Sequence, residues 1–226
     1  MTSITKSELI RQVRIVLDQN EDNGVLSGAF EDTDQLQTDD IIEQCLQYAI
    51  DRVLDMAPLW MIPELISRME SDVTARSYGK YGKKCEAPED MYRPVSMLCT
   101  DWEQQVYEFT DKLSPVYAMQ KSEFGGIRGN IYDPVVALVT DPIANDGKLY
   151  FEIYDTGEQN AYISYVKKLE VDDDMEIPSL ILQAIVYTTA NLYYVTLGNS
   201  NMAEMMAAEA KEALKKYDDK EVNNGK

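Results

Sequence analysis

The chain has 226 residues, of which 40 are acidic and 21 are basic, so that its formal net charge is −19. This length fits one domain or two small ones, and a hydrophobic share of 45% with 15 tyrosines is too high for a disordered acidic tail. Histidine is absent, which excludes Ser/His/Asp and Cys/His nucleophile systems and every imidazole-bound metal site.

The acidity argues against a broad affinity for nucleic acid, because DNA binding needs clustered Lys and Arg to displace condensed counterions. The local basic cluster is formed by Lys80, Lys83 and Lys84, in a stretch that also contains tyrosine and glycine. We interpret this stretch as a solvated loop, with a local DNA contact as the alternative.

Three cysteines, Cys45, Cys85 and Cys99, are far apart and lack any Cys-x-x-Cys spacing. Neither a zinc knuckle nor a disulfide framework is therefore indicated, and a reducing cytosol is the simplest compartment. The N-terminus has no apolar signal core, and no apolar run approaches the ~18 residues of a membrane span. We expect a soluble protein with no membrane partner.

The first predicted element is a helix from Lys6 to Asp18. Thr5 and Glu8 have the spacing of a capping box, and Ile4 and Leu9 have that of a hydrophobic staple. A long polar loop is predicted to follow, over residues 19–37.

A second helix is predicted from Asp39 to Met56, with Thr38 as its cap and with apolar residues at three- and four-residue steps. Pro58 ends it, and a short helix can open at Pro63. Residues 4–70 therefore form an N-terminal helical part.

Residues 91–168 are predicted to form an antiparallel sheet of short strands, with turns at 145–147 and 155–157 joining the last three. In the strand that starts at Lys148, the side chains alternate in the way expected of a strand with one buried face. Ser114 is predicted to cap a short helix. The predicted strands are Arg93–Thr100, Glu103–Phe109, Val135–Thr140, Lys148–Tyr154 and Ala161–Val166.

Two helices are predicted within residues 178–217, separated by Gly198, and residues 218–226 are expected to fray. The first helix is apolar on nearly all sides, which implies burial on more than one face. The fold class is therefore α+β, a single domain of 226 residues in which N- and C-terminal helices pack around a central antiparallel β-sheet.

Two acidic patterns could hold a metal ion. Asp18, Asn20 and Asp22 have the spacing that begins a calcium loop, but Ala29 stands where the bidentate Glu belongs, so a polar loop is favoured. The other pattern is adjacent acidic residues, the pair Asp39–Asp40 and the triplet Asp172–Asp174, which we interpret as helix starts, where negative charge complements the helix dipole. We therefore expect no metal and no cofactor.

The glycine-rich stretch Gly125–Gly129 superficially resembles a phosphate loop. It lacks the Gly-Lys-Ser/Thr ending, and we interpret it as a connector.

The last helix has an Ala/Met-rich surface that includes Met202, Met205 and Met206. Small and flexible apolar residues suit adaptable packing against another subunit, and ordinary packing within one chain is an equal alternative.

The order and texture of these elements carry a resemblance over about Ile4 to Lys216. The chain resembles the head-to-tail adaptor and ring proteins of short-tailed bacteriophages, and is most similar to the ring proteins of crAss-like phages. The segments on which this resemblance rests are Arg93–Leu98, Asp101–Glu103, Ser114–Tyr117, Asp133–Val135, Leu149–Tyr154, Ile177–Leu180 and Leu197–Asn199.

The resemblance implies a non-enzymatic structural subunit of a twelve-fold ring, located in the neck or tail of the virion and assembled in the host cytoplasm. Such a ring binds beneath the portal protein, contacts an adjacent tail ring or tail-fibre proteins, and extends the channel through which duplex DNA passes. The portal or subunit contact carried over to this chain is Met202, Met205, Met206, Ala210 and Leu214.

An acidic ring wall would repel phosphate and let DNA pass without adhering, although the acidity can also simply keep subunits apart before assembly. Two other functions stay open. One is an acidic cytoplasmic protein-interaction module, and the other is a magnesium hydrolase that uses Asp172–Asp174.

Overall fold

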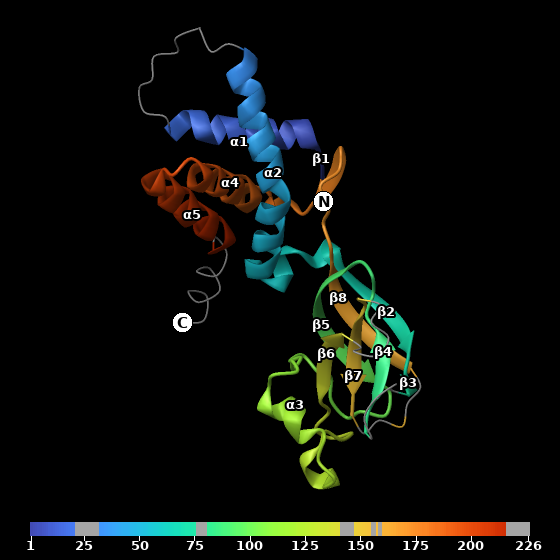
Figure 1. Ribbon diagram of the computed structural model, residues 1–226. Helices are drawn as coiled ribbons and strands as arrows, with labels where there is room; N and C mark the ends of the chain where they lie inside the picture. The colour runs from blue at the N-terminus through green and yellow to red at the C-terminus, as the bar shows by residue number, and fades with distance from the viewer. Residues whose placement is uncertain (21–31, 76–80, 141–146, 155–156, 158–159, 216–226) are drawn as a thin grey trace, which may run out of the picture. The chain divides into compact units, whose positions relative to one another are not determined.

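A computed structural model describes residues 1–20, 32–75, 81–140, 147–154, 157 and 160–215, without the side chains of 18–20 and 32–37. The predicted α+β class is confirmed. The chain, for which the sequence predicts a single domain, divides into two compact units (Figure 1). We call Met1–Glu64 with Leu169–Lys226 the helical unit, and Leu65–Lys168 the sheet unit.

The helical unit is built from helices of the two ends of the chain. The predicted start of α1 is confirmed, because the Glu8 N–H donates to Thr5 Oγ1 at 3.1 Å, while Ile4 and Leu9 are both buried. The long helices are α1 (Lys6–Asn20), α2 (Asp32–Met56), α4 (Ser179–Thr196) and α5 (Ser200–Lys215).

The helix α2 begins at Asp32, so Thr38 lies inside it and the prediction of a cap there is wrong. The predicted loop at 19–37 is helical at both ends, and its residues 21–31 lie outside the described part. Since Asp32–Gln37 contains neither glycine nor proline, nothing breaks the helix there, and acidic residues suit its first turn. After 3-10 turns at Leu59–Met61 and Pro63–Leu65, the chain enters a strand.

The burial of α4 on more than one face is confirmed, since it packs against α1, α2 and α5. Asn191 of α4 is buried and donates from Nδ2 to the Ala203 carbonyl of α5 at 2.7 Å. The predicted break between the two helices is at Gly198, whose φ is +73°, a conformation that glycine adopts without steric cost.

A two-stranded sheet, which the sequence does not predict, completes the helical unit. Strand β1 (Thr2–Thr5) pairs antiparallel with β9 (Asp174–Ile177), and in this pairing Ile4 lies opposite Met175, 171 positions later in the chain. Ile4, Met175 and Ile177 are buried, so one face of the ribbon packs on the unit and the other faces solvent.

The sheet unit contains two antiparallel sheets, with strand orders β2-β8-β5 and β3-β4-β7-β6 (Figure 1). The turn predicted at 155–157 therefore does not join two paired strands, because β7 and β8 belong to different sheets. The strands are β2 (Ile66–Asp72), β3 (Thr74–Ala75), β4 (Lys83–Glu86), β5 (Met91–Cys99), β6 (Val136–Thr140), β7 (Leu149–Ile153) and β8 (Asn160–Lys167).

The predicted strand Glu103–Phe109 is not a strand. The segment instead crosses from one sheet to the other, with single bridges that join Val106 to Met97 of β5 and Thr110 to Ala137 of β6. It therefore covers an open edge of each sheet, and an edge that is covered no longer invites pairing with another chain. Side chains of both sheets form one core between them, with Phe151 and Ile163 fully buried.

The short helix α3 (Pro115–Met119) covers the outer face of the second sheet. Its predicted cap is confirmed, since the Val116 N–H donates to Ser114 Oγ at 3.2 Å. Tyr117 of α3 packs with Tyr154, and both are buried. The prediction of a half-buried β7 is wrong for this reason: even Glu152 is 1% exposed, and its carboxylate accepts from Tyr154 Oη at 2.7 Å.

The described cysteines are all free thiols, and two of them, Cys85 and Cys99, lie in the core of the sheet unit. Burial, assisted by the nearby Cys99, raises the pKa of the Cys85 thiol from 9.0 to about 12. Because the folded state favours the neutral thiol, its stabilising contribution is complete below pH 9 and is lost as the pH rises toward 12.

We therefore expect the free energy of unfolding to fall above pH 9, with Cys85 contributing up to about 1.4 kcal/mol per pH unit. Urea unfolding at pH 8, 9.5 and 10.5 measures this dependence. Burial also raises the pKa of Tyr165, so the control is Cys85→Ala, which should show a shallower pH dependence than the wild type. Equal slopes in the two proteins would contradict this assignment.

Candidate interaction surfaces

The five residues that the resemblance assigns to a portal contact do not share one surface. Met206, Ala210 and Leu214 are buried in the helical unit, which is the intrachain packing that the sequence leaves open as an alternative. Met202 is half-buried, and Met205 is 52% exposed. Of the five, Met205 alone presents most of its side chain to a partner.

Two further large apolar side chains near the junction of the last two helices are exposed like Met205. Val195 at the end of α4 is 58% exposed, and Leu197 in the connection is 56% exposed. We call Val195, Leu197 and Met205 the α4–α5 corner. Val195 and Met205 lie in helices, and the Leu197 N–H donates to the Tyr193 carbonyl at 3.1 Å, so the backbone at all three positions is held by hydrogen bonds.

A larger apolar surface lies in the sheet unit, at residues 107–132, which we call the apolar segment. Ten large apolar side chains among the described residues are more than half exposed, and six of them belong to this segment, so it is the main concentration of exposed apolar surface. These six are Tyr107 (66%), Leu113 (95%), Met119 (51%), Phe124 (76%), Ile127 (52%) and Tyr132 (64%).

The backbone of the apolar segment is held by hydrogen bonds from side chains. Gln120, 1% exposed, donates to the Val116 carbonyl at 2.9 Å and accepts from the Gly129 N–H at 2.7 Å. The Asp111 carboxylate accepts from the Leu113 N–H at 2.6 Å, which fixes the backbone of the most exposed leucine. The exposed side chains are therefore displayed by an ordered backbone.

The glycine-rich stretch is a connector within this segment. A 3-10 turn spans Gly125–Ile127, and the Gly129 N–H is occupied by Gln120. A Cβ at Gly129 would lie 2.7 Å from the Val135 nitrogen, so close approach of the backbone requires glycine. The sequence signal for the surface consists of apolar residues in turns, with no helical or strand period, and this pattern alone predicts no surface. These residues are Leu113, Phe124 and Ile127.

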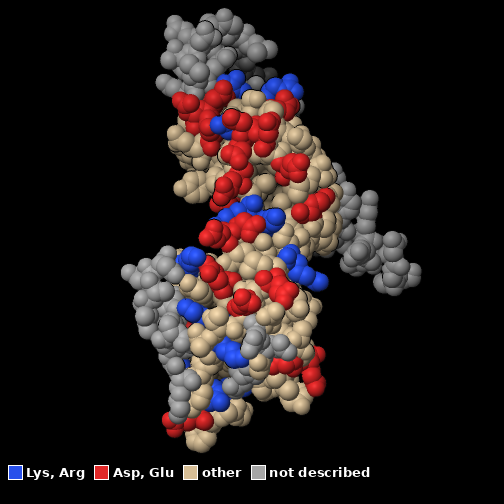
Figure 2. Space-filling view, turned by 90° about the vertical axis from the view of Figure 1, so that its right-hand side faces the viewer, with Lys and Arg blue, Asp and Glu red and all other residues tan. Residues whose placement is uncertain are grey.

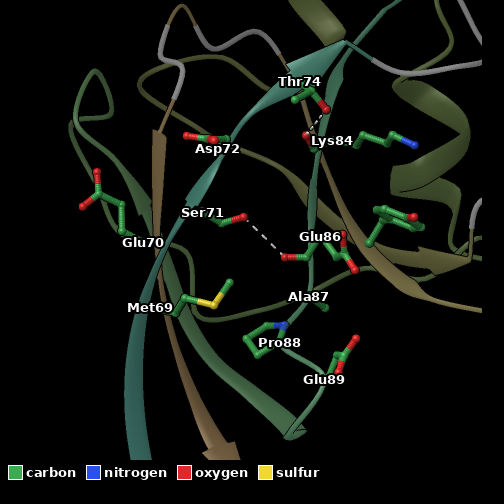
Figure 3. Close-up of a pocket in the computed structure, with 11 residues that line it drawn as sticks. Met69, Glu70, Ser71, Asp72, Thr74, Lys84, Glu86, Ala87, Pro88 and Glu89 are labelled. Atoms are coloured by element: carbon green, nitrogen blue, oxygen red, sulfur yellow. Dashed lines mark hydrogen bonds between the residues drawn. The ribbon is translucent and has the colours of Figure 1, made fainter.

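An open groove of about 630 Å³ lies between β2 and β4 of the sheet unit (Figure 3). Met69 and Ser71 point from β2 toward β4, whereas Glu70 points away, and the Ser71 hydroxyl lies 3.5 Å from the Glu86 carbonyl. Ala87 and Pro88 add apolar lining. The lining of the groove thus combines small apolar groups with acidic side chains, and the groove is large enough to accept an apolar side chain.

The predicted basic loop is partly a strand. Lys83 and Lys84 lie in β4, and Lys80 lies outside the described residues. The Lys84 ammonium stands over the Tyr150 ring at 4.4 Å from its centre.

The acidic triplet lies at the start of β9 and not at the start of α4, so its interpretation as that helix's first turn is wrong. Its position instead suits α1, since the Lys6 N–H donates to the Asp173 carbonyl at 3.0 Å and the Lys6 ammonium lies 3.7 Å from the Asp173 carboxylate. The pair at 39–40 lies within α2, where Arg14 Nε donates to Asp39 Oδ1 at 2.6 Å. Asp173 and Asp39 therefore each form an ion pair with a basic residue of α1.

The first positions of the calcium pattern, Asp18 and Asn20, lie within α1, and Asp22 lies outside the described residues. Within the part of the chain that the structure describes, no group of three or more Cys, Asp or Glu side chains is close enough to hold a metal ion. None of the described helices is both long and apolar enough to cross a membrane.

Charge is distributed unequally between the units. The helical unit has 9 basic and 24 acidic residues, a net charge of −15, and the sheet unit has 12 basic and 16 acidic residues, a net charge of −4. On the face drawn in Figure 2, acidic side chains gather over the helical unit. The two units thus define a protein with one strongly acidic part and one part with exposed apolar surface.

Two comparisons with known proteins gave no match. No protein-family model matches the sequence, and no curated protein matches it.

Proposed function

We propose that this protein is a non-enzymatic subunit of a twelve-fold ring that binds beneath the portal of a short-tailed phage and extends its DNA channel. The observation that carries the proposal is the separation of acidity and apolar exposure between two units of one chain. A ring subunit needs both a surface for its neighbours and a wall past which DNA can move.

The helical unit is the part suited to the channel wall. Twelve copies at −15 would surround the channel with negative charge, and the unscreened reach of that charge is about 8 Å at physiological salt. Phosphate would be repelled at the wall, so duplex DNA could move without adhering.

The α4–α5 corner is the surface that fits a portal contact. Of the residues that the resemblance assigns to this contact, it includes Met205 but not the three buried ones. Val195 and Leu197 supply the other exposed side chains. Its partners in the virion would be the portal protein and, on the far side of the ring, an adjacent tail ring or tail-fibre protein.

If the ring wall is inert toward DNA, the Kd of the wild type for duplex DNA should exceed about 100 μM at 50 mM salt. Fluorescence anisotropy with a labelled duplex measures this affinity. As a contrast, replacing the exposed Asp172, Asp173 and Asp174 with Lys should produce measurable, salt-sensitive binding. Micromolar binding by the wild type would contradict an inert channel wall.

Ring formation itself is tested by light scattering of the purified protein, alone and with candidate portal. A twelve-fold ring has a mass of twelve times 25.7 kDa, about 308 kDa. Single copies that persist in every mixture and never bind portal would instead support the acidic interaction module.

A further inference from the structure

The six exposed side chains of the apolar segment together present an area close to one side of a protein–protein interface. From the exposed fractions of its six side chains, at about 150–200 Å² each, the segment presents on the order of 700 Å². One partner of a stable protein–protein interface contributes about 800 Å². The size of the surface therefore fits a protein partner.

The charge of the apolar segment fits a second copy of this chain. Residues 107–132 contain three acidic and three basic residues, so the segment has no net charge although the chain carries −19. Identical chains carry identical charge, and two helical units at −15 repel one another. Copies can approach most closely through the neutral segment of the sheet unit.

The groove between β2 and β4 is the complementary surface. Its volume of about 630 Å³ exceeds that of a Leu or Phe side chain, and Met69, Ala87 and Pro88 offer apolar contacts. The apolar segment begins beside β6, where the Thr110 N–H donates to the Val136 carbonyl at 2.9 Å. In the order β3-β4-β7-β6, the groove borders β4 and the segment begins beside β6, while α3 of the segment extends over the outer face of β7.

We propose that copies of this protein join head to tail through their sheet units, with the apolar segment of one copy seated in the β2–β4 groove of the next. This inference rests on the proposed ring function and names the surfaces that would build the ring. A contact between two different surfaces leaves one of each free at the ends of a chain of copies, and a ring closes when the last pair meets.

The first variant removes the segment's most exposed side chains, Leu113→Ser with Phe124→Ser. Because both residues are exposed, the double variant should fold, which circular dichroism and thermal unfolding verify. We expect it to run at the monomer mass by light scattering under conditions in which the wild type forms rings. The matched control, Tyr48→Ser with Met56→Ser, removes exposed apolar side chains of α2 that lie outside the α4–α5 corner, and it should retain ring mass.

The second variant blocks the groove with Glu89→Trp at an exposed turn position, and it should also be monomeric. An equal mixture of the two variants is the decisive sample. One protein keeps its groove and the other keeps its segment, so the mixture should form dimers of twice the monomer mass and no rings. Faster hydrogen exchange in residues 107–132 of the Glu89→Trp variant alone than in the mixture would locate the contact.

Rings formed by the Leu113→Ser, Phe124→Ser variant, or a mixture that stays monomeric, would overturn this contact and leave the ring function standing. If the wild type itself formed no ring with or without portal, the proposed function would fail, and the head-to-tail contact with it.

Discussion

Replacing Phe151 with alanine is expected to lower the free energy of unfolding by about 3–5 kcal/mol. Phe151 is 0% exposed, and its ring lies 5.6 Å from that of Phe109, centre to centre. Its strand β7 is the inner strand that pairs with both β4 and β6. Removing the ring would open a cavity where three strands and the crossing segment meet, and a close-packed interior cannot collapse to fill it.

Urea unfolding of the two proteins measures this loss. Leu149→Ala is the matched control, because Leu149 lies in the same strand but is 42% exposed, and it should cost less than about 1 kcal/mol. Similar losses of unfolding free energy at the two positions would show that Phe151 is not on the buried face of β7.

The second large effect is expected at Met206 in α5. Met206 is 2% exposed and packs within the helical unit, so Met206→Ala should lower the free energy of unfolding by about 2–5 kcal/mol. The neighbouring Met205→Ala is a close control, since the residue type is identical and Met205 is 52% exposed. We expect an effect within about 0.5 kcal/mol there.

The same pair separates stability from binding. In an assay with candidate portal, Met205→Ala should weaken the contact although its thermal unfolding is unchanged. Reversed stabilities of the two variants would mean that α5 presents its other face, and the α4–α5 corner would then be misplaced.

The local signals of this sequence predict its helices well. The cap at Thr5, the cap at Ser114 and the break at Gly198 each depend on a few adjacent residues, and each occurs as predicted. The burial of α4 follows from its composition alone.

The pairing of distant strands could not be predicted in the same way. β1 and β9 are four residues each, too short for an alternation to be recognised, and they pair across nearly the whole chain. β2 follows Pro63, which favours a helix start, and its strand form depends on β8, about 90 residues later. β7 is buried on its outer face only because α3 covers it, so its alternating sequence was misleading.

The exposed apolar surfaces could be predicted only in part, for a related reason. An Ala/Met-rich helix has the same composition whether its apolar side meets its own chain or another, and only the position of α4 separates Met206 from Met205. The apolar segment has no periodic pattern, so its importance appears only when the exposed fractions of its side chains are known.

Cryo-electron microscopy of the protein mixed with candidate portal tests the central claim most directly. The account predicts a closed ring of twelve copies on the portal, with sheet units in contact between neighbours and acidic side chains of the helical units lining the lumen. Isolated copies, or a ring with a neutral or basic lumen, would contradict it.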